Sequence, residues 1–357
     1  MVMIDWLSAR APECFDGDIT GGSVLKVTPD GEVEWCSHSK KRIEGSFQSS
    51  VMVRQLTVDE TRQGSVVPGQ GTRSHGCIFE GNPAKFLQGH NLFGPADATD
   101  LLTRSLGKIG QAIGQEPWPF DFGQSNLTRI DLTSSWLVDR AEDALPFLKA
   151  MEERCHVPYR GRGVVPPSGP GTLYWGYKKK GERASPWQIK IYLKGLEIAK
   201  RPLHREAMEI PGLLEELART IRVEVTLRTP ELKRLGMTRA RDFTPESCAR
   251  VWEEYVGKID FGEDAMTLDT NDLARLNLKP RHTHAIAAWK AGNDMKAGLS
   301  ESTFYRLRKE IRDATGIDIA LGVPVSNVVP LRRVVVAKPA SRPKWHDALQ
   351  GVYARVA

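Results

Sequence analysis

The pattern of apolar and polar positions is most regular between residues 127 and 228, where four short runs alternate with the period of two that is typical of β-strands. These runs cover residues 127–138, 172–180, 187–193 and 220–228, and helical patterns at 141–155 and 210–220 separate them. The order β-α-β-β-α-β is the ferredoxin-like pattern. Its usual strand order, 4-1-3-2, predicts that the first, third and fourth strands are neighbours. Helices are expected on one face of the sheet, and the other face is expected to be free.

The segments on either side of this region have different patterns. Residues 1–118 contain several alternating runs, two of which flank the turn signal "PDG" at residues 29–31 and predict an opening hairpin. Helical patterns dominate from residue 233 onward. We therefore expect an α+β protein with a β-rich N-terminal part (1–118), a βαββαβ core (119–232) and a mainly helical C-terminal domain (233–357).

Composition is that of a soluble globular protein. Apolar residues make up 40% of the 357, and no apolar run approaches the roughly 20 residues that span a membrane. The N-terminal stretch lacks the basic start and apolar centre of a signal peptide, so we expect a cytoplasmic protein. Five widely scattered cysteines, an odd number, favour neither a disulfide framework nor a zinc site.

The formal charge of +6 is unevenly distributed. From residue 281 onward there are 13 Lys and Arg against 6 Asp and Glu, whereas the preceding chain has 37 against 38. Such basic blocks commonly face polyanions, above all nucleic acid, and a solvated basic face is the alternative. Residues 178–205 hold nine basic residues against two acidic ones, as expected of a surface that binds a DNA backbone.

Side chains alternate across a strand, so residues of equal parity share a face. On the first, third and fourth predicted strands the apolar residues must face the helices, which places three polar side chains together on the free face: Asp131, Tyr192 and Glu224. Basic residues of the same parity accompany them, namely Arg129, Lys190 and Arg222. Taken singly, each of these residues is more commonly solvated or salt-bridged than functional, and it is their shared face that indicates a site.

The two carboxylates suggest a metal. Close carboxylates repel each other, and a divalent cation that prefers oxygen ligands, Mg²⁺ or Mn²⁺, relieves the repulsion, so Asp131 and Glu224 are the predicted ligands. A tyrosine beside such a cation suggests a nucleophile, because a metal-polarised phosphodiester with lysines nearby accepts attack by its hydroxyl. The products are a phosphotyrosine link and a free 3′-hydroxyl, and the retained bond energy permits later rejoining.

Five stretches carry a resemblance to a known family: "MIDWL" at residues 3–7, "PDGEVEW", "EGNPAKFLQGHNLFG" at 80–94, "LTRIDLT" and "IKIYLKGLE". Together they resemble the replication initiation proteins of filamentous phages, of the gene II/gene X type, over roughly residues 3–230. The resemblance implies a protein that nicks one strand of the double-stranded phage circle at the origin through a 5′-phosphotyrosine intermediate. It further implies that this protein starts rolling-circle replication and rejoins the displaced strand.

The resemblance also implies roles for single residues. The Y-x-K-G-x-E segment is similar to that of trans-acting rolling-circle plasmid initiators. In that comparison Tyr192 is the nucleophile, Lys194 its phosphate-facing neighbour and Glu197 a further candidate metal ligand. Asp131 and Glu224 match the carboxylates of the strand motifs.

Two other segments have less certain roles. The related nickase superfamily binds its metal with His-hydrophobe-His on a strand, and the matching spacing here is His282-Thr283-His284. Its polar centre and helical surroundings indicate the start of a helix instead of a metal site. In "EGNPAKFLQGHN", Lys85 is expected either to touch DNA or support the active site, or to belong to a well-packed turn.

The basic C-terminal region contains "LSESTFYRLRKEIRDATG", a predicted helix capped by Ser300, with a supporting helix before it. The pair resembles a helix-turn-helix whose second helix enters the major groove, and an ordinary amphipathic helical pair is the alternative. The residues expected to meet DNA are Ser302, Thr303, Tyr305, Arg306 and Lys309.

Two classes of function remain. The first is a site-specific, metal-dependent DNA nickase with strand-transfer activity. The second is a non-enzymatic origin-binding or repressor protein, which needs the basic C-terminal region but has no use for carboxylates and a tyrosine on one face. The nickase is expected to act on double-stranded origin DNA and single-stranded DNA with the host helicase and polymerase, as a homodimer on DNA and without a membrane.

Overall fold

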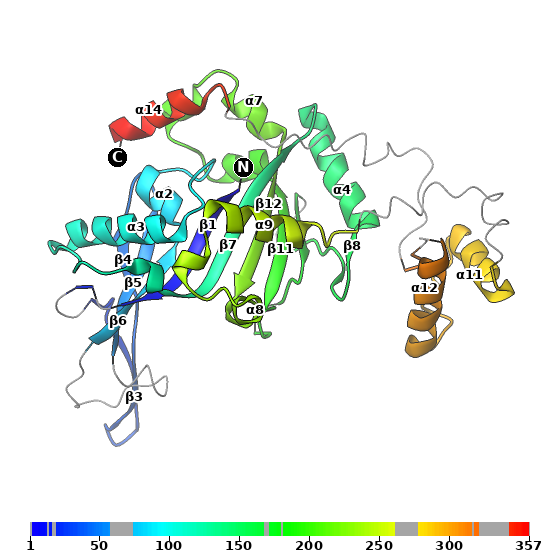
Figure 1. The fold of residues 1–357 in the computed structure, drawn as a ribbon, viewed down its shortest axis with the longest axis horizontal. Helices are drawn as coiled ribbons and strands as arrows, with labels where there is room; N and C mark the ends of the chain where they lie inside the picture. The colour runs from blue at the N-terminus through cyan, green and yellow to red at the C-terminus, as the bar shows by residue number, and fades with distance from the viewer. Residues whose placement is uncertain are drawn as a thin grey trace.

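The computed structural model describes residues 2–12, 14–15, 19–57, 74–167, 171–179, 181–260, 278–315, 318–320 and 343–356. Its main feature is an eight-stranded antiparallel sheet (Figure 1). In spatial order the strands are β10 (Thr172–Trp175), β11 (Trp187–Leu193), β12 (Thr220–Arg228), β7 (Asn126–Leu137), β1 (Met3–Ala11), β6 (Ser74–Gly81), β5 (Ser50–Thr57) and β4 (Lys41–Glu44). Two short pairs accompany it: β2 (Ser23–Val27) with β3 (Val33–His38), the predicted hairpin, and β8 (His156–Val157) with β9 (Gly161–Arg162).

This sheet joins two of the three predicted parts of the chain. β1 pairs with β6 on one side and with β7 on the other, so residues 1–118 and 119–232 share one sheet. The third part reaches the same core through α9 (Pro245–Val256), where Trp252 Nε1 donates to the Val223 carbonyl at 3.2 Å. The boundaries at 118 and 232 therefore do not separate hydrophobic cores, and independent folding of the three parts stays a prediction.

The strand order differs from the ferredoxin-like order predicted for residues 119–232. The four strands of that region lie in the order β10-β11-β12-β7, so the fourth strand is between the third and the first. The predicted order 4-1-3-2 is therefore wrong, although the first, third and fourth strands do lie side by side. Alternation fixes which face a side chain takes but not which strand is its neighbour, and the other edge of β7 is occupied by β1.

One face of β7, β12 and β11 is apolar and fully buried. Its side chains are Ile130, Leu132, Ile189, Ile191, Val223 and Val225, all with no exposed surface. Two helices cover this face, α4 (Ala144–Arg154) and α9, the second of which is capped by Thr244 and begins with Pro245. Burial of each such side chain contributes about 1.5–3 kcal/mol, so this face provides much of the stability of the fold.

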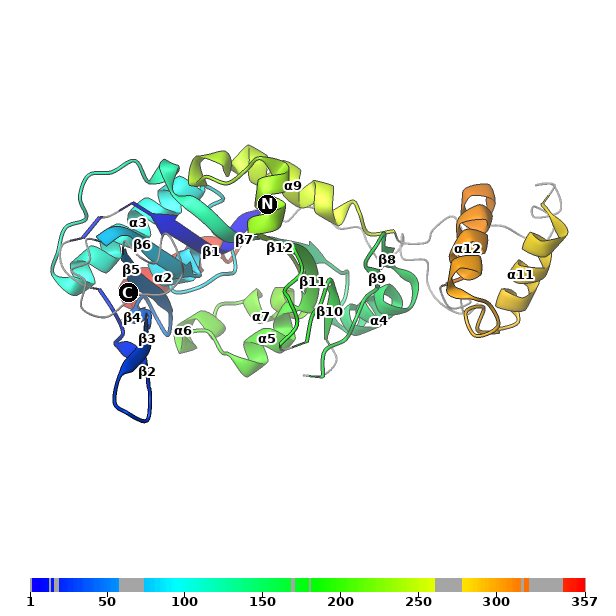
Figure 2. The ribbon, with the colours of Figure 1, turned by 90° about the horizontal axis from the view of Figure 1, so that it is seen from below.

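The opposite face, predicted to be free, is covered. The covering helices are α5 (Lys194–Lys200), α6 (Arg205–Met208), α7 (Leu213–Ala218) and α14 (His346–Val356), and Figure 2 shows α5 and α7 on the side of the sheet away from α9. They enclose a second hydrophobic cluster made of Ile198, Ala207, Leu213, Leu217, Trp345, Leu349, Val352 and Tyr353. The helix from the far end of the chain therefore packs over the polar face, which alternation within the strands does not reveal.

The connection between β6 and β7 begins with two helices. α2 (Pro83–Gln88) starts at Asn82, whose side chain accepts a hydrogen bond from the Lys85 amide, and it ends at Gly89 with a left-handed φ of 83°. α3 (Ala98–Ile113) follows, with the Asp97 side chain accepting a hydrogen bond from the Asp100 amide at its start. The remaining short helical segments are α8 (Thr229–Leu235), η1 (Phe122–Gln124), η2 (Ala141–Asp143) and η3 (Ala240–Asp242).

A helical pair, α11 (Pro280–Lys290) and α12 (Glu301–Thr315), forms its own small cluster beside the main body (Figure 1). His282 lies in α11 and its Nε2 is 2.8 Å from Glu310 Oε2 of α12, so it links the two helices, in keeping with the predicted helix start. Among the helices that the structure describes, none is long and apolar enough to cross a membrane.

Candidate active site

A pocket on the covered face of the sheet brings the predicted residues together. It has a volume of about 340 Å³, and Asp131 from β7, Glu224 from β12 and Tyr192 from β11 all line it. Lys190 stands opposite Glu224 in the strand register, and Asp131 stands opposite Thr226. Asp131 and Glu224 are therefore diagonal neighbours on adjacent strands, a relation with about 7–8 Å between Cα atoms.

A further acidic residue, Asp5, reaches the same pocket through an irregularity in β1. The register between β1 and β7 shifts between Ile4 and Trp6, so Asp5 is the extra residue of a β-bulge. As a result Asp5 and Trp6 both line the pocket, while Ile4 and Leu7 on either side are buried in the core. Sequence reasoning missed Asp5. The signal was that the apolar residues Ile4 and Leu7 are three positions apart, whereas residues on one face of a regular strand are two positions apart.

The segment after β6 holds Asp5 in place. Asp5 Oδ1 accepts hydrogen bonds from Asn82 Nδ2 at 2.7 Å and from Asn91 Nδ2 at 2.9 Å. Asn91 Oδ1 in turn accepts from Lys194 Nζ at 3.2 Å. The stretch "EGNPAKFLQGHN" is thus part of the site itself, and Lys85 within it is half-buried and lines the pocket.

Basic side chains compensate the carboxylates on the sheet. Arg129 donates to both oxygens of Asp131, at 2.9 and 2.5 Å, and its guanidinium lies 5.2 Å from the centre of the Trp6 ring. Lys190 Nζ is 3.4 Å from Glu224 Oε2 and 4.2 Å from the centre of the Tyr192 ring. Buried charges require such partners, so the ion pairs keep a polar site stable under the covering helices.

Burial dominates the ionisation of the two central groups. It raises the pKa of Glu224 to about 7; Lys190 opposes the rise, and the nearby Asp131 and Asp5 carboxylates add to it. Burial also raises the pKa of Tyr192 well above its usual value, against the effect of Arg222, and the carboxylate of Glu197 adds to the rise. The tyrosine is therefore a neutral phenol at rest, and added positive charge in the pocket would favour both ionised forms.

The carboxylates of the pocket fit a divalent cation whose coordination shell is completed by other ligands. Within the described ranges, no three Asp, Glu, His or Cys residues are grouped so that they hold an ion by themselves. Mg²⁺, however, is commonly bound through one or two carboxylates with substrate phosphate and water completing its shell. Asp131 and Glu224 suit that mode, whereas Glu197, on the rim of the same pocket, is held by Lys194 Nζ at 2.5 Å.

Two predicted residues lie deeper than expected. Arg222 is 2% exposed and donates to the backbone carbonyls of Asn91 at 2.6 Å and Leu92 at 3.2 Å, so its terminal nitrogens are engaged within the protein and its contact with DNA stays a prediction. Lys194 is fully buried as the first residue of α5, and burial together with Arg222 lowers its pKa. It lines a neighbouring pocket, not the one that Tyr192 lines.

The predicted C-terminal contacts are on a different surface from the pocket. On α12 the side chains of Ser302, Tyr305, Arg306 and Lys309 are exposed. Thr303 is half-buried, and its hydroxyl accepts a hydrogen bond from Ser300 Oγ at 2.8 Å. Phe304 and Ile311 face the cluster with α11, so the exposed residues form the outer side of an amphipathic helix.

Comparisons with known proteins decide the family. The family model for the N-terminal part of the phage replication-associated gene II protein matches residues 3–246, and that for its C-terminal part matches residues 273–349. The chain belongs to this family of phage replication-associated proteins. A relative, the replication-associated gene II protein of Enterobacteria phage I2-2, is 35% identical over an alignment of 358 positions that covers 97% of this chain and 97% of its own.

The predicted family is thereby confirmed. Among solved structures, a rolling circle replication initiator protein from Geobacillus stearothermophilus is similar over 90% of this chain and 98% of its own. Its sequence identity is 14% and the TM-score is 0.27, too low to carry an argument about fold or mechanism.

Proposed function

We propose that this protein starts rolling-circle replication by nicking one strand of double-stranded circular phage DNA at the origin, with Tyr192 as the nucleophile. The observation that carries the proposal is the common pocket of Tyr192, Asp131 and Glu224 on three neighbouring strands. Membership of the family of phage replication-associated proteins gives the replication context. A repressor or simple origin-binding protein has no need for a buried tyrosine among carboxylates.

The proposed reaction is a transesterification. The Tyr192 hydroxyl attacks the phosphorus, the bond to the 3′-oxygen breaks, and a 5′-phosphotyrosine and a free 3′-hydroxyl result. The phenolic proton passes to a carboxylate of the pocket or to water, and the leaving oxygen takes up a proton. Since one phosphoester replaces another, a 3′-hydroxyl later attacks the phosphotyrosine and rejoins the strand without an external energy source.

The pocket residues have separate tasks in this reaction. Asp131 and Glu224 would hold Mg²⁺ or Mn²⁺, which supplies charge that polarises the scissile phosphate and favours the phenolate. Arg129, which is bound to Asp131 at rest, and Lys190 are positioned to bind phosphate oxygens, with Lys85 on the opposite wall. Lys194 acts through Glu197 and Asn91, which it holds in place.

We assign duplex binding to the basic C-terminal region. The exposed residues of α12, with Arg306 and Lys309 among them, form the outer side of a helix of the size that enters a major groove. On this proposal the partners are origin duplex, the displaced single strand and the host helicase and polymerase, in the bacterial cytoplasm, with a homodimer on the origin.

The test is a nicking assay on supercoiled phage DNA carrying the origin, with Mg²⁺. The parent protein should convert it to open circles and become covalently attached to a 5′ end, and Tyr192→Phe should do neither. Tyr174→Phe is the matched control, because Tyr174 stands opposite Lys190 on the neighbouring strand but does not line the pocket. Nicking by Tyr192→Phe at the parent rate would refute the nucleophile assignment, and duplex binding without any nicking by the parent would favour the repressor.

A further inference from the structure

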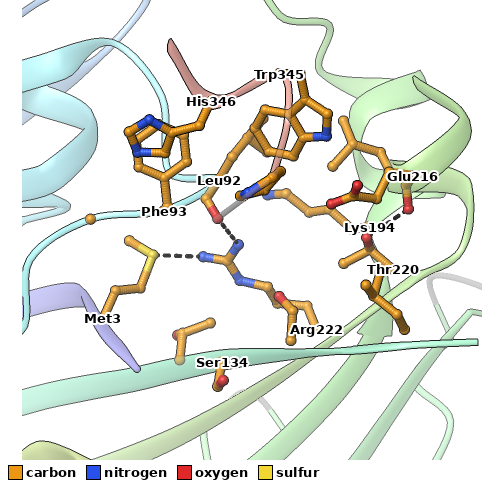
Figure 3. Close-up of a pocket in the computed structure, with 16 residues that line it drawn as sticks. Met3, Leu92, Phe93, Ser134, Lys194, Glu216, Thr220, Arg222, Trp345 and His346 are labelled. Atoms are coloured by element: carbon orange, nitrogen blue, oxygen red, sulfur yellow. Dashed lines mark hydrogen bonds between the residues drawn. The ribbon is translucent and has the colours of Figure 1, made fainter. Parts of the chain in front are cut away.

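A second pocket adjoins the proposed active site. It has a volume of about 360 Å³, and Lys194 and Arg222 are among the residues that line it (Figure 3). Lys194 binds Asn91 and Glu197, both of which line the tyrosine pocket, so the two pockets share a wall. Tyr192 and Lys194 are two residues apart at the end of a strand, a separation of about 6.6 Å.

The wall of this second pocket is mostly apolar and partly aromatic. The close-up in Figure 3 shows Phe93 and Trp345 on the side opposite Ser134 of the sheet, with Leu92 and Met3 between them. The Phe93 ring stacks on His346 with 3.9 Å between ring centres. Flat apolar walls of this kind suit a planar ligand.

Three residues that line this pocket each have a buried polar atom without a hydrogen-bond partner among the residues described. These atoms are Trp345 Nε1, Arg222 Nε and Thr133 Oγ1, and their residues are 7%, 2% and 0% exposed. An unsatisfied buried donor is unfavourable by about 1–3 kcal/mol. Three of them around one cavity indicate a polar ligand, because a cavity that serves only packing would be lined by apolar atoms.

We propose that this pocket takes an unstacked nucleobase of the DNA strand next to the scissile phosphate, an inference that rests on the proposed nickase function. A base fits better than a phosphate, because the terminal donors of Arg222 and Lys194 are already engaged with the Asn91 and Leu92 carbonyls and with Glu197. Indole and guanidinium N–H groups donate only. The unpaired N–H groups therefore require acceptor atoms on the bound base, which every base offers, so the pocket is expected to distinguish a base from an abasic sugar.

The experiment measures binding of fluorescein-labelled single-stranded 12-mers to the full-length protein by anisotropy, in EDTA at fixed salt. The probes are dT12, dA12 and a 12-mer of abasic sugar-phosphate, so the backbone contribution is common to all. The parent should bind dT12 and dA12 more tightly than the abasic strand. Trp345→Phe, which keeps the ring plane but removes the N–H, should weaken dT12 binding about 10-fold and the abasic strand hardly at all.

Two further variants make the result interpretable. Trp118→Phe is the matched control, since Trp118 is 44% exposed and lines neither pocket, and it should bind as the parent does. Thr133→Val removes a second unpartnered group with almost no change of shape and should repeat the loss for dT12. Thr133→Val should unfold at the parent temperature, because the group that it loses has no partner among the described residues of the free protein. Trp345→Phe also removes packing from the cluster around Tyr353, so its effect is judged by the ratio of dT12 to abasic-strand binding.

Three results would overturn the proposal. They are equal affinity of the parent for dT12 and the abasic strand, parent-like binding by both pocket variants, and a clear drop in the unfolding temperature of Thr133→Val. Competition with dTMP separates the two sources of a base. If dTMP alone binds as tightly as dT12, the pocket serves free nucleotides and the assignment to the strand is wrong. Because EDTA suppresses cleavage, these outcomes are independent of whether Tyr192→Phe still nicks.

Discussion

The two faces of the sheet at β7, β12 and β11 are both shielded from solvent, but in different ways. On one face Ile191 and Val223 are packed against helices with no exposed surface. On the other, Asp131, Glu224 and Tyr192 are 2%, 7% and 6% exposed, yet they line a cavity and are held by ion pairs. The first face stabilises the fold, whereas the second keeps charges desolvated beside open space, an arrangement that favours catalysis over stability.

The largest expected effect is a loss of activity from the polar face. Asp131→Asn and Glu224→Gln remove the charges that would hold the cation, so origin nicking should fall at least about 1,000-fold, on the order of 4 kcal/mol in the barrier. Duplex binding should change less than about twofold, because Lys and Arg contacts with phosphate dominate it. Nicking is followed by gel, binding by anisotropy. Joint loss of binding and nicking would instead assign these carboxylates to the fold.

The corresponding change on the apolar face should have the opposite signature. Ile191→Ala leaves a cavity in a fully buried site and should lower the free energy of unfolding by about 2–5 kcal/mol. Urea unfolding measures this, and nicking per folded molecule should stay near that of the parent. Tyr192→Phe, one position along the strand, serves as the control and should change stability by less than about 1 kcal/mol. If Tyr192→Phe lowers the free energy of unfolding more than Ile191→Ala does, the apolar face is not the one that stabilises the fold.

The covering of the polar face is tested at Gly89. A Cβ there would lie 2.4 Å from the Tyr353 ring, and the residue also has a left-handed φ of 83°. Gly89→Ala should therefore destabilise the protein by about 2–4 kcal/mol, from strain and overpacking together, and loosen α14.

Gly114→Ala isolates the backbone contribution, since Gly114 has a φ of 73° and a Cβ added to it would meet no described atom within 4 Å. That variant should lose only about 1 kcal/mol. Thermal unfolding and limited proteolysis near residue 343 give the comparison. If Gly89→Ala and Gly114→Ala destabilise the protein equally, close contact between Gly89 and Tyr353 does not help to hold α14 over the polar face.

The smallest effect concerns neither face. Arg306→Ala on α12 should weaken origin duplex binding by about 1–3 kcal/mol and relax specificity at one position if Arg306 contacts a base edge. A phosphate contact would instead weaken all sequences alike and reduce the salt slope by about one. Anisotropy at several salt concentrations distinguishes these. Unchanged duplex binding would exclude the helix-turn-helix hypothesis.

Sequence parity predicted well which side chains share the pocket, because it depends on a local rule. Strand alternation placed Asp131, Tyr192 and Glu224 on one face, and the structure brings them into one pocket. The same rule failed for Asp5, because a bulge breaks the alternation. It also placed Arg222 on the correct face without indicating that the Asn91 and Leu92 carbonyls bury it.

Long-range features were beyond such reasoning. Strand order depends on which edges meet, and the pairing of β1 with β7 excluded the ferredoxin-like arrangement. The covering of the polar face likewise depends on contacts between α14 and residues far earlier in the chain, such as the 3.1 Å hydrogen bond from the His204 amide to the Tyr353 hydroxyl. No local periodicity encodes such a contact.

The position of α14 bears on when the pocket is completed during synthesis. The pocket is lined by Asp5 near the start of the chain and by Tyr353 near the end of the described residues, so a nascent chain still on the ribosome contains Tyr192 but not the finished wall. The residue proposed as the nucleophile therefore lies in a half-built site until α14 emerges from the ribosome.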